Sequence, residues 1–192
     1  MKEDRKRWDW KYRDREFDPS HGASPILKKY LRFFPRGKAL DLAAGEGRNA
    51  VFLAEHGFEA EAVDISPVAI SRARKSARAR GVTIRAFAAD LDTYSILRGH
   101  YDVILDFYFL DRHLIPEIKK GLKKGGMVVF ETYTAEQKKL GTEGPGQDKY
   151  LLKPNELLRL FRGFHVLFYR EGVFREGGKR RAIASLIAQK NK

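Results

Sequence analysis

One segment constrains the fold of this chain more than any other: residues 38–50, which read Lys-Ala-Leu-Asp-Leu-Ala-Ala-Gly-Glu-Gly-Arg-Asn-Ala. A short apolar run ends in small residues and a Gly-x-Gly, and a helical pattern then continues from Asn49 to His56. A strand, a tight turn and a helix N-terminus therefore follow one another directly. Such a turn presents bare backbone N–H groups and the positive end of a helix dipole to a ligand.

Two classes of ligand are compatible with this turn. The spacing Gly45-x-Gly47-x-x-Ala50 matches the dinucleotide fingerprint, and Asp64 lies about 20 residues further on, where a ribose-binding acid is expected. Asp41 distinguishes the two classes, because it lies in a strand that should be apolar throughout in a dinucleotide site. A buried carboxylate is costly unless it meets a partner. A ligand that carries an ammonium and a sulfonium group would supply that partner, whereas a pyrophosphate would not.

From this turn onward the chain resembles the class I S-adenosylmethionine-dependent methyltransferases. Their turn reads acid-x-small-x-Gly-x-Gly, as residues 41–47 do, although Ala43 stands where a glycine is usual. Asp64 matches the acid that holds the ribose hydroxyls in this family, and Asp90-Leu91 match the pair that contacts adenine. The resemblance implies S-adenosyl-L-methionine as the cofactor. The cofactor-binding residues that it implies are Tyr12, Asp41, Ala43, Gly45, Gly47, Arg48, Asn49, Asp64, Ile65, Asp90, Leu91 and Phe107.

A purely structural alternative exists for two of these residues. Asp64 could simply cap the helix expected at 67–80, and Asp90 could cap the turn that follows it, because aspartate is a favoured capping residue.

Within the class, the chain is similar to the small bacterial tellurite-resistance and thiopurine-methyltransferase-like branch. The Trp8-x-x-x-Tyr12 arm, residues 45–49, 131–133 and 151–158, and the basic C-terminal hairpin carry this resemblance. It implies a methyltransferase that acts on a small, soft or anionic acceptor such as tellurite, selenite or a thiol. The hairpin departs from the tellurite enzymes, because residues 166–192 contain arginines but no histidine.

Open parallel sheets bind ligands beyond the carboxyl ends of their strands. The loops expected there are 107–111, 133–150 and the final hairpin. We therefore predict that Tyr108, Tyr133, Arg175 and Arg180 contact a small-molecule acceptor.

The sequence assigns no catalytic residue. A thiolate, selenide or tellurite attacks a sulfonium methyl group without a general base. An oxygen or nitrogen nucleophile would usually need a base, for which His21 and His113 are the candidates, although both also fit as ordinary surface or helix-start residues.

The charge of the chain leaves a second function open. The formal net charge is +13, but the basic residues are scattered rather than arranged in one stripe. An RNA-directed methyltransferase, or a non-catalytic S-adenosylmethionine-binding protein, is therefore the alternative, with nucleic acid possible but not favoured.

The composition of the chain bears on disulfide and metal sites and on the cellular location that we expect. No cysteine is present, which excludes disulfides and thiolate sites, and Asp106 and Asp111 alone are too few for a metal. No run approaches the roughly 20 apolar residues of a membrane span, and the charged N-terminus has no signal-peptide pattern. We therefore expect a cytoplasmic protein, while its oligomeric state is left open.

Strand and helix patterns alternate along the chain, which predicts an α/β fold: a doubly wound, Rossmann-like, mostly parallel seven-stranded sheet with a C-terminal antiparallel hairpin strand. We expect a single methyltransferase domain over 1–192, in which residues 1–22 form an arm or lid and 23–192 the core. The expected strands are 38–42, 59–64, 82–88, 101–107, 127–132, 164–171 and 180–189. The expected helices are 3–16, 24–34, 48–56, 67–80, 112–122 and 154–162, with a short turn or helix near 93–98.

Overall fold

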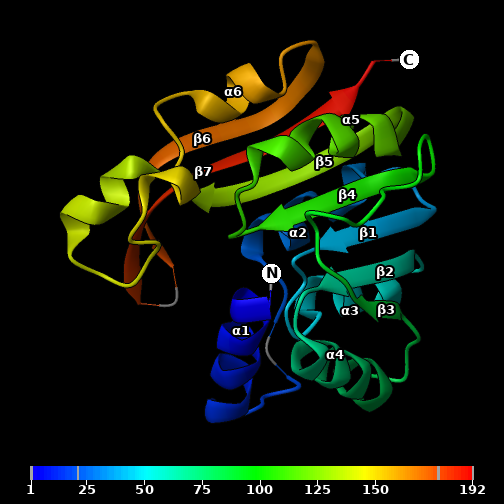
Figure 1. The fold of residues 1–192 in the computed structure, drawn as a ribbon. Helices are drawn as coiled ribbons and strands as arrows, with labels where there is room; N and C mark the ends of the chain where they lie inside the picture. Colours follow the sequence, from blue (N-terminus) through cyan, green and yellow to red (C-terminus); the bar gives the residue numbers. More distant parts are fainter. Residues whose placement is uncertain (1, 21, 177, 192) are drawn as a thin grey trace.

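The protein is described by a computed structural model that covers residues 2–20, 22–176 and 178–191. Its centre is a seven-stranded sheet in the order β3-β2-β1-β4-β5-β7-β6 (Figure 1). The strands from β3 to β5 run parallel, and β7 is antiparallel to both of its neighbours. The predicted fold class is therefore confirmed. The strands are β1 Lys38–Leu42, β2 Glu59–Asp64, β3 Arg85–Ala88, β4 Tyr101–Phe107, β5 Leu122–Tyr133, β6 Phe164–Glu176 and β7 Lys179–Lys190.

Helices cover both faces of this sheet (Figure 1). They are α1 Lys2–Asp14, α2 Pro25–Tyr30, α3 Arg48–Glu55, α4 Pro67–Ala79, α5 Ile115–Gly121 and α6 Glu156–Leu160. One apolar core joins Ile118 of α5 and Leu157 of α6 to the sheet, and a second joins Leu27 of α2 and Leu53 of α3 to the opposite face. Burial on both faces explains why the central strands read as nearly continuous apolar runs.

Several predicted elements are only partly matched by the structure. Of the turn or helix expected near 93–98, the structure has a turn at residues 91–93 and no helix, and Ile96 is buried against Gly121. A side chain at position 121 would approach Ile96 to 2.4 Å, so this contact requires the glycine. The helix expected over 112–122 is a 3-10 turn at 112–114 followed by α5, because β5 already begins at Leu122. The strand expected from residue 82 begins only at Arg85.

The carboxyl ends of the parallel strands gather at one edge of the sheet, which positions the site. The helix α1 and the segment 134–150 lie on the side to which the arrowheads of β4 and β5 point (Figure 1). Among the residues that the model describes, no helix is long and apolar enough to cross a lipid bilayer.

Candidate functional site

A cavity of about 1610 Å³ opens at the carboxyl ends of the parallel strands. Its wall includes most of the residues that the sequence predicted to bind a ligand. Those residues are Tyr12, Asp41, Ala43, Gly45, Arg48, Asn49, Asp64, Ile65, Asp90, Leu91, Phe107, Tyr108 and Tyr133.

The turn after β1 adopts left-handed backbone conformations at three positions: Ala43 (φ 49°), Gly45 (φ 55°) and Gly47 (φ 73°). The conformation of Ala43 explains why a glycine is usual at that position, since glycine adopts it without strain. At Gly45 a Cβ atom would lie 2.6 Å from the Tyr12 hydroxyl, so the glycine allows Tyr12 to approach this face of the turn closely.

Gly47 has a structural role at the start of α3. A Cβ atom there would lie 2.8 Å from the Cβ atom of Ala73 in α4, so Gly47 allows the turn and α4 to approach each other closely. It does not belong to the cavity wall, although the sequence placed it among the cofactor-binding residues.

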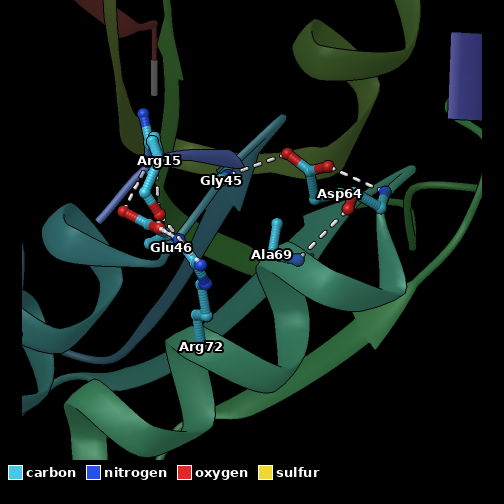
Figure 2. Close-up of polar contacts among 7 residues, drawn as sticks. Arg15, Gly45, Glu46, Asp64, Ala69 and Arg72 are labelled. Carbon is cyan, nitrogen blue, oxygen red and sulfur yellow. Dashed lines mark hydrogen bonds and ion pairs between the residues drawn. The ribbon is translucent and has the colours of Figure 1, made fainter. Parts of the chain in front are cut away.

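Asp64, at the end of β2, holds the turn in place. One carboxylate oxygen accepts a hydrogen bond from the Gly45 N–H at 2.8 Å, and the other accepts one from the Ser66 N–H at 2.9 Å (Figure 2). The helix α4 is capped instead by Ser66, whose hydroxyl oxygen accepts from the Ala69 N–H at 3.1 Å. The alternative in which Asp64 caps this helix is therefore wrong.

Asp90 does start a turn, as the capping alternative proposed. Its carboxylate accepts from the Asp92 N–H at 3.1 Å, and its backbone carbonyl accepts from the Tyr94 N–H at 2.9 Å. Asp90 and Leu91 nevertheless line the cavity, so the two roles coexist.

Two carboxyl groups are buried near the carboxyl ends of β1 and β4. Asp41 is 2% exposed and accepts a hydrogen bond from the Ala50 N–H at 3.2 Å; its burial raises its pKa to about 7. Burial, together with the nearby Asp41, raises the pKa of Asp106 well above its usual value. Within the described part of the chain, Oδ1 of Asp106 has no hydrogen-bond partner. A cation bound nearby would offset the cost of ionising these groups.

The N-terminal helix α1 lies against the turn. Tyr12 is its buried residue, and burial followed by the charge of Asp64 raises the pKa of the Tyr12 phenol. Asp9 accepts a hydrogen bond from the Ser66 hydroxyl at the start of α4. Glu46 of the turn pairs with Arg15 at 2.5 Å and with Arg72 of α4 at 2.8 Å (Figure 2). These contacts bring the arm to the cavity; whether it opens and closes as a lid stays a prediction.

The acceptor-site prediction is only partly matched by the positions of the side chains. Tyr108 and Tyr133 line the cavity with ring centroids 5.2 Å apart. Arg175 and Arg180 do not line the cavity. They lie opposite each other in the register of β6 and β7, and both residues are exposed. The cavity is lined by Arg181 instead. Consecutive residues of a strand such as Arg180 and Arg181 point to opposite faces of the sheet, and the sequence did not reveal which of these faces borders the cavity.

One of the two histidines proposed as bases lies in the cavity wall. His113 lines the cavity and is exposed. His21 lies outside the described residues.

Comparison with known proteins finds similarity to methyltransferases in the central part of the chain. Residues 39–126 match the family model described as a methyltransferase domain. The chain is 38% identical to Hemagglutinin 1 of Eikenella corrodens over 108 residues, which cover 53% of this chain and 36% of the relative. It is 33% identical to the 2-heptyl-1-hydroxyquinolin-4(1H)-one methyltransferase of Mycobacteroides abscessus over 101 residues, 52% of this chain and 44% of the relative. The chain thus spans less than half the length of these relatives.

The fold matches a solved structure over most of its length. The crystal structure of TehB from Haemophilus influenzae superposes with a TM-score of 0.74 and 19% sequence identity, covering 88% of this chain and 63% of that one. At this level of identity the comparison establishes a shared fold.

Proposed function

We propose that this chain, which has the fold and the methyltransferase domain of the class I S-adenosylmethionine-dependent methyltransferases, transfers a methyl group to a small, soft or anionic acceptor. The cofactor of this class is S-adenosyl-L-methionine, which supplies an electrophilic methyl carbon on a positively charged sulfur. The acceptor, the residues assigned to it and the activity of the whole protein belong to this proposal.

The residues around the turn fit that cofactor. Gly45 lets the Tyr12 ring pack against the turn. The Asp41 carboxyl is buried with Arg48 as a nearby positive charge, and Oδ1 of Asp106 has no hydrogen-bond partner among the described residues, so an ammonium and a sulfonium group would add positive charge beside these two acids. A dinucleotide would bring further negative charge to the same place. We assign the ribose to Asp64 and the adenine to Asp90 and Leu91.

The chain contributes alignment and exclusion of water rather than acid–base chemistry. In-line transfer from a sulfonium depends on holding the reactants in position and removing solvent, which a walled cavity achieves. Tyr12, Phe107, Tyr108 and Tyr133 supply aromatic walls, and aromatic faces attract a cation. A soft nucleophile needs no base, so the absence of an assigned base is compatible with this acceptor class.

The observation that carries the choice of acceptor is Arg181 in the cavity wall. Its guanidinium lies over the Tyr108 ring, 5.2 Å from the centroid, and donates a hydrogen bond to the Tyr108 hydroxyl. A cation in such a place suits a small anion. Arg181 takes the role that the sequence assigned to Arg175 and Arg180.

The test is a cofactor titration followed by an acceptor panel. We expect S-adenosylmethionine to bind more tightly than NAD, and methyl transfer to one or more of hydrosulfide, thiophenol, selenite and tellurite, with none to bulk RNA. NAD binding more tightly than S-adenosylmethionine would contradict the cofactor assignment. Methylation of RNA alone would contradict the acceptor assignment, and binding without any transfer would favour a non-catalytic cofactor-binding protein.

A further inference from the structure

Tyr108 adopts a backbone conformation that is costly for a large side chain. Its φ angle is 61°, and among the described non-glycine residues only Ala43 and Asn155 also have a positive φ. Its N–H donates to the backbone carbonyl of Glu131 at 2.7 Å, which fixes the residue against β5. Strained conformations of this kind persist only where the surrounding structure enforces them, and they cluster at functional sites.

The hydroxyl of Tyr108 lies between an arginine and a buried carboxylate. It donates to Oε1 of Glu131 at 3.3 Å and accepts from Nη1 of Arg181 at 3.0 Å. Glu131 is 1% exposed and is itself held by the Ser185 hydroxyl at 2.6 Å and by Arg170 at 3.3 Å. A hydroxyl that donates to a carboxylate offers its lone pairs to the arginine, so the buried network sets the direction of the Arg181 contact.

A second cluster of a tyrosine, a glutamate and an arginine lies elsewhere in the sheet, away from the cavity, and serves as a comparison. The Tyr101 hydroxyl donates to Glu61 at 2.8 Å, and Arg85 pairs with Glu61 directly at 2.9 Å. Tyr101 is fully buried, and none of these three residues belongs to the cavity wall. In the Tyr108 cluster Arg170 likewise pairs with the glutamate, but a further arginine, Arg181, bonds to the phenol, and both Tyr108 and Arg181 line the cavity.

We propose that Tyr108 is a positioning residue that holds Arg181 against the cavity wall, and that the pair thereby selects acceptors by their negative charge. An arginine side chain is long and loses much rotamer freedom when it is ordered. Fixing it in advance through the Tyr108 hydroxyl removes part of that cost from acceptor binding. This inference rests on the proposed function, since it concerns the acceptor half of the same cavity.

The first test compares Tyr108→Phe with the matched control Tyr101→Phe, because each variant removes one hydroxyl that donates to a buried glutamate. The acceptors are hydrosulfide, an anion, and dimethyl sulfide, a neutral sulfur nucleophile. In Tyr108→Phe we expect the KM for hydrosulfide to rise about tenfold, the equivalent of one hydrogen bond. The KM for dimethyl sulfide and the Kd for S-adenosylmethionine should stay unchanged. Tyr101→Phe should lower Tm and leave the hydrosulfide KM unchanged.

Equal rises for both acceptors in Tyr108→Phe would overturn the selection by charge, as would an unchanged KM for hydrosulfide. A rise of the same size in Tyr101→Phe would show that loss of stability, and not positioning, is responsible.

A binding measurement keeps the inference testable if no acceptor is turned over. Thiocyanate, a soft anion, is titrated into the protein loaded with S-adenosylhomocysteine, and the NMR signals of the arginine Nε–H groups are followed. We expect a saturable shift of the Arg181 signal, with affinity about tenfold weaker in Tyr108→Phe. If thiocyanate binds in this way but no acceptor is methylated, the positioning role of Tyr108 is supported and the proposed function is rejected. Equal thiocyanate affinity in both proteins would reject the positioning role.

Discussion

Asp41 gives the ligand-free chain a stability that depends on pH. Its folded-state pKa is raised from 3.8 to about 7, chiefly by burial. Between these two values the folded state keeps a proton that the unfolded state has lost, so the folded state binds more protons. The contribution of Asp41 to the free energy of unfolding should therefore fall as pH rises from about 4 to about 7, by up to about 4 kcal/mol, and then level off. Urea unfolding across this range measures it.

The control for this prediction replaces the ionisable group. Asp41→Asn should reduce the slope between pH 4 and 7 by the Asp41 contribution and leave the part due to the other buried carboxyl groups, Asp64 and Asp106. Asp148→Asn, whose side chain is 85% exposed, should leave the slope as it is. A cationic cofactor prefers the ionised carboxylate, so its affinity should increase over the same pH range. An unchanged slope in Asp41→Asn would assign the effect to another buried carboxyl, such as Asp106.

Gly47 and Gly57 allow a second prediction at the scale of single residues. Both have positive φ angles, 73° and 82°, but a Cβ atom at 47 would lie 2.8 Å from Ala73 whereas one at 57 would meet nothing within 4 Å. Gly57→Ala should cost about 1 kcal/mol from backbone strain. Gly47→Ala adds a steric clash and should cost about 1–3 kcal/mol more. Equal losses in urea unfolding would contradict a packing role for Gly47.

Sequence was most informative at residues whose chemistry conflicts with their position. An aspartate within an apolar strand identified Asp41, and glycines in a turn identified Gly45. Arg181 could not be identified in the same way, because residues 182–188 of β7 are all buried and show no alternation that would reveal which face the preceding arginines occupy. Glu131 entered the sequence analysis only through the family resemblance of residues 131–133. Its hydrogen bonds could not be inferred, since the partners Arg170 and Ser185 are distant in the sequence.

At the scale of elements, α1 is the segment whose function is most open to test. Within this helix, Tyr12 is the residue classed as buried, so the sheet and its two apolar cores do not depend on α1. Deleting residues 1–17 should leave a folded core by circular dichroism and abolish methyl transfer, because the turn would lose the Tyr12 cover that excludes water. Arg13→Gln, at an exposed position of the same helix, is the control and should keep its activity. Full activity of the truncated chain would rule out a lid.

The doubly wound, mostly parallel sheet followed from the alternation of strands and helices, since right-handed crossovers leave few topologies for such a pattern. The elements that sequence left open or placed imprecisely are those fixed by contacts between distant residues. Near residues 93–98 the sequence allowed a turn or a helix, and the structure has the turn without a helix, because Ile96 packs in the core against Gly121. Local propensity could not reveal that contact, because the two residues meet only after the sheet has formed.

For the molecule as a whole, the net charge of +13 comes from basic residues that are scattered along the sequence. Several of its arginines are used to hold elements together: Arg72 pairs with Glu46, Arg80 with Glu55, and Arg112 with Glu156. These pairs connect α4 and the 3-10 turn at 112–114 to neighbouring segments. Charge of this kind produces weak, non-specific attraction to polyanions rather than a defined docking site.

Bulk RNA should therefore bind weakly, lose affinity steeply with added salt, and receive no methyl group. Lys75 and Arg78 are exposed on α4, so replacing both by alanine should lower RNA affinity and reduce the salt dependence by up to about two phosphate contacts. The same variant should methylate the small acceptor at the wild-type rate, because neither residue lines the cavity. RNA binding is measured between about 50 and about 200 mM salt, a range over which phosphate contacts weaken. Methyl transfer is measured with RNA and with the small acceptor. If the variant lost methyl transfer to RNA while no small acceptor was turned over by the wild type, the basic face of α4 would be the substrate site and the cavity would serve the cofactor alone.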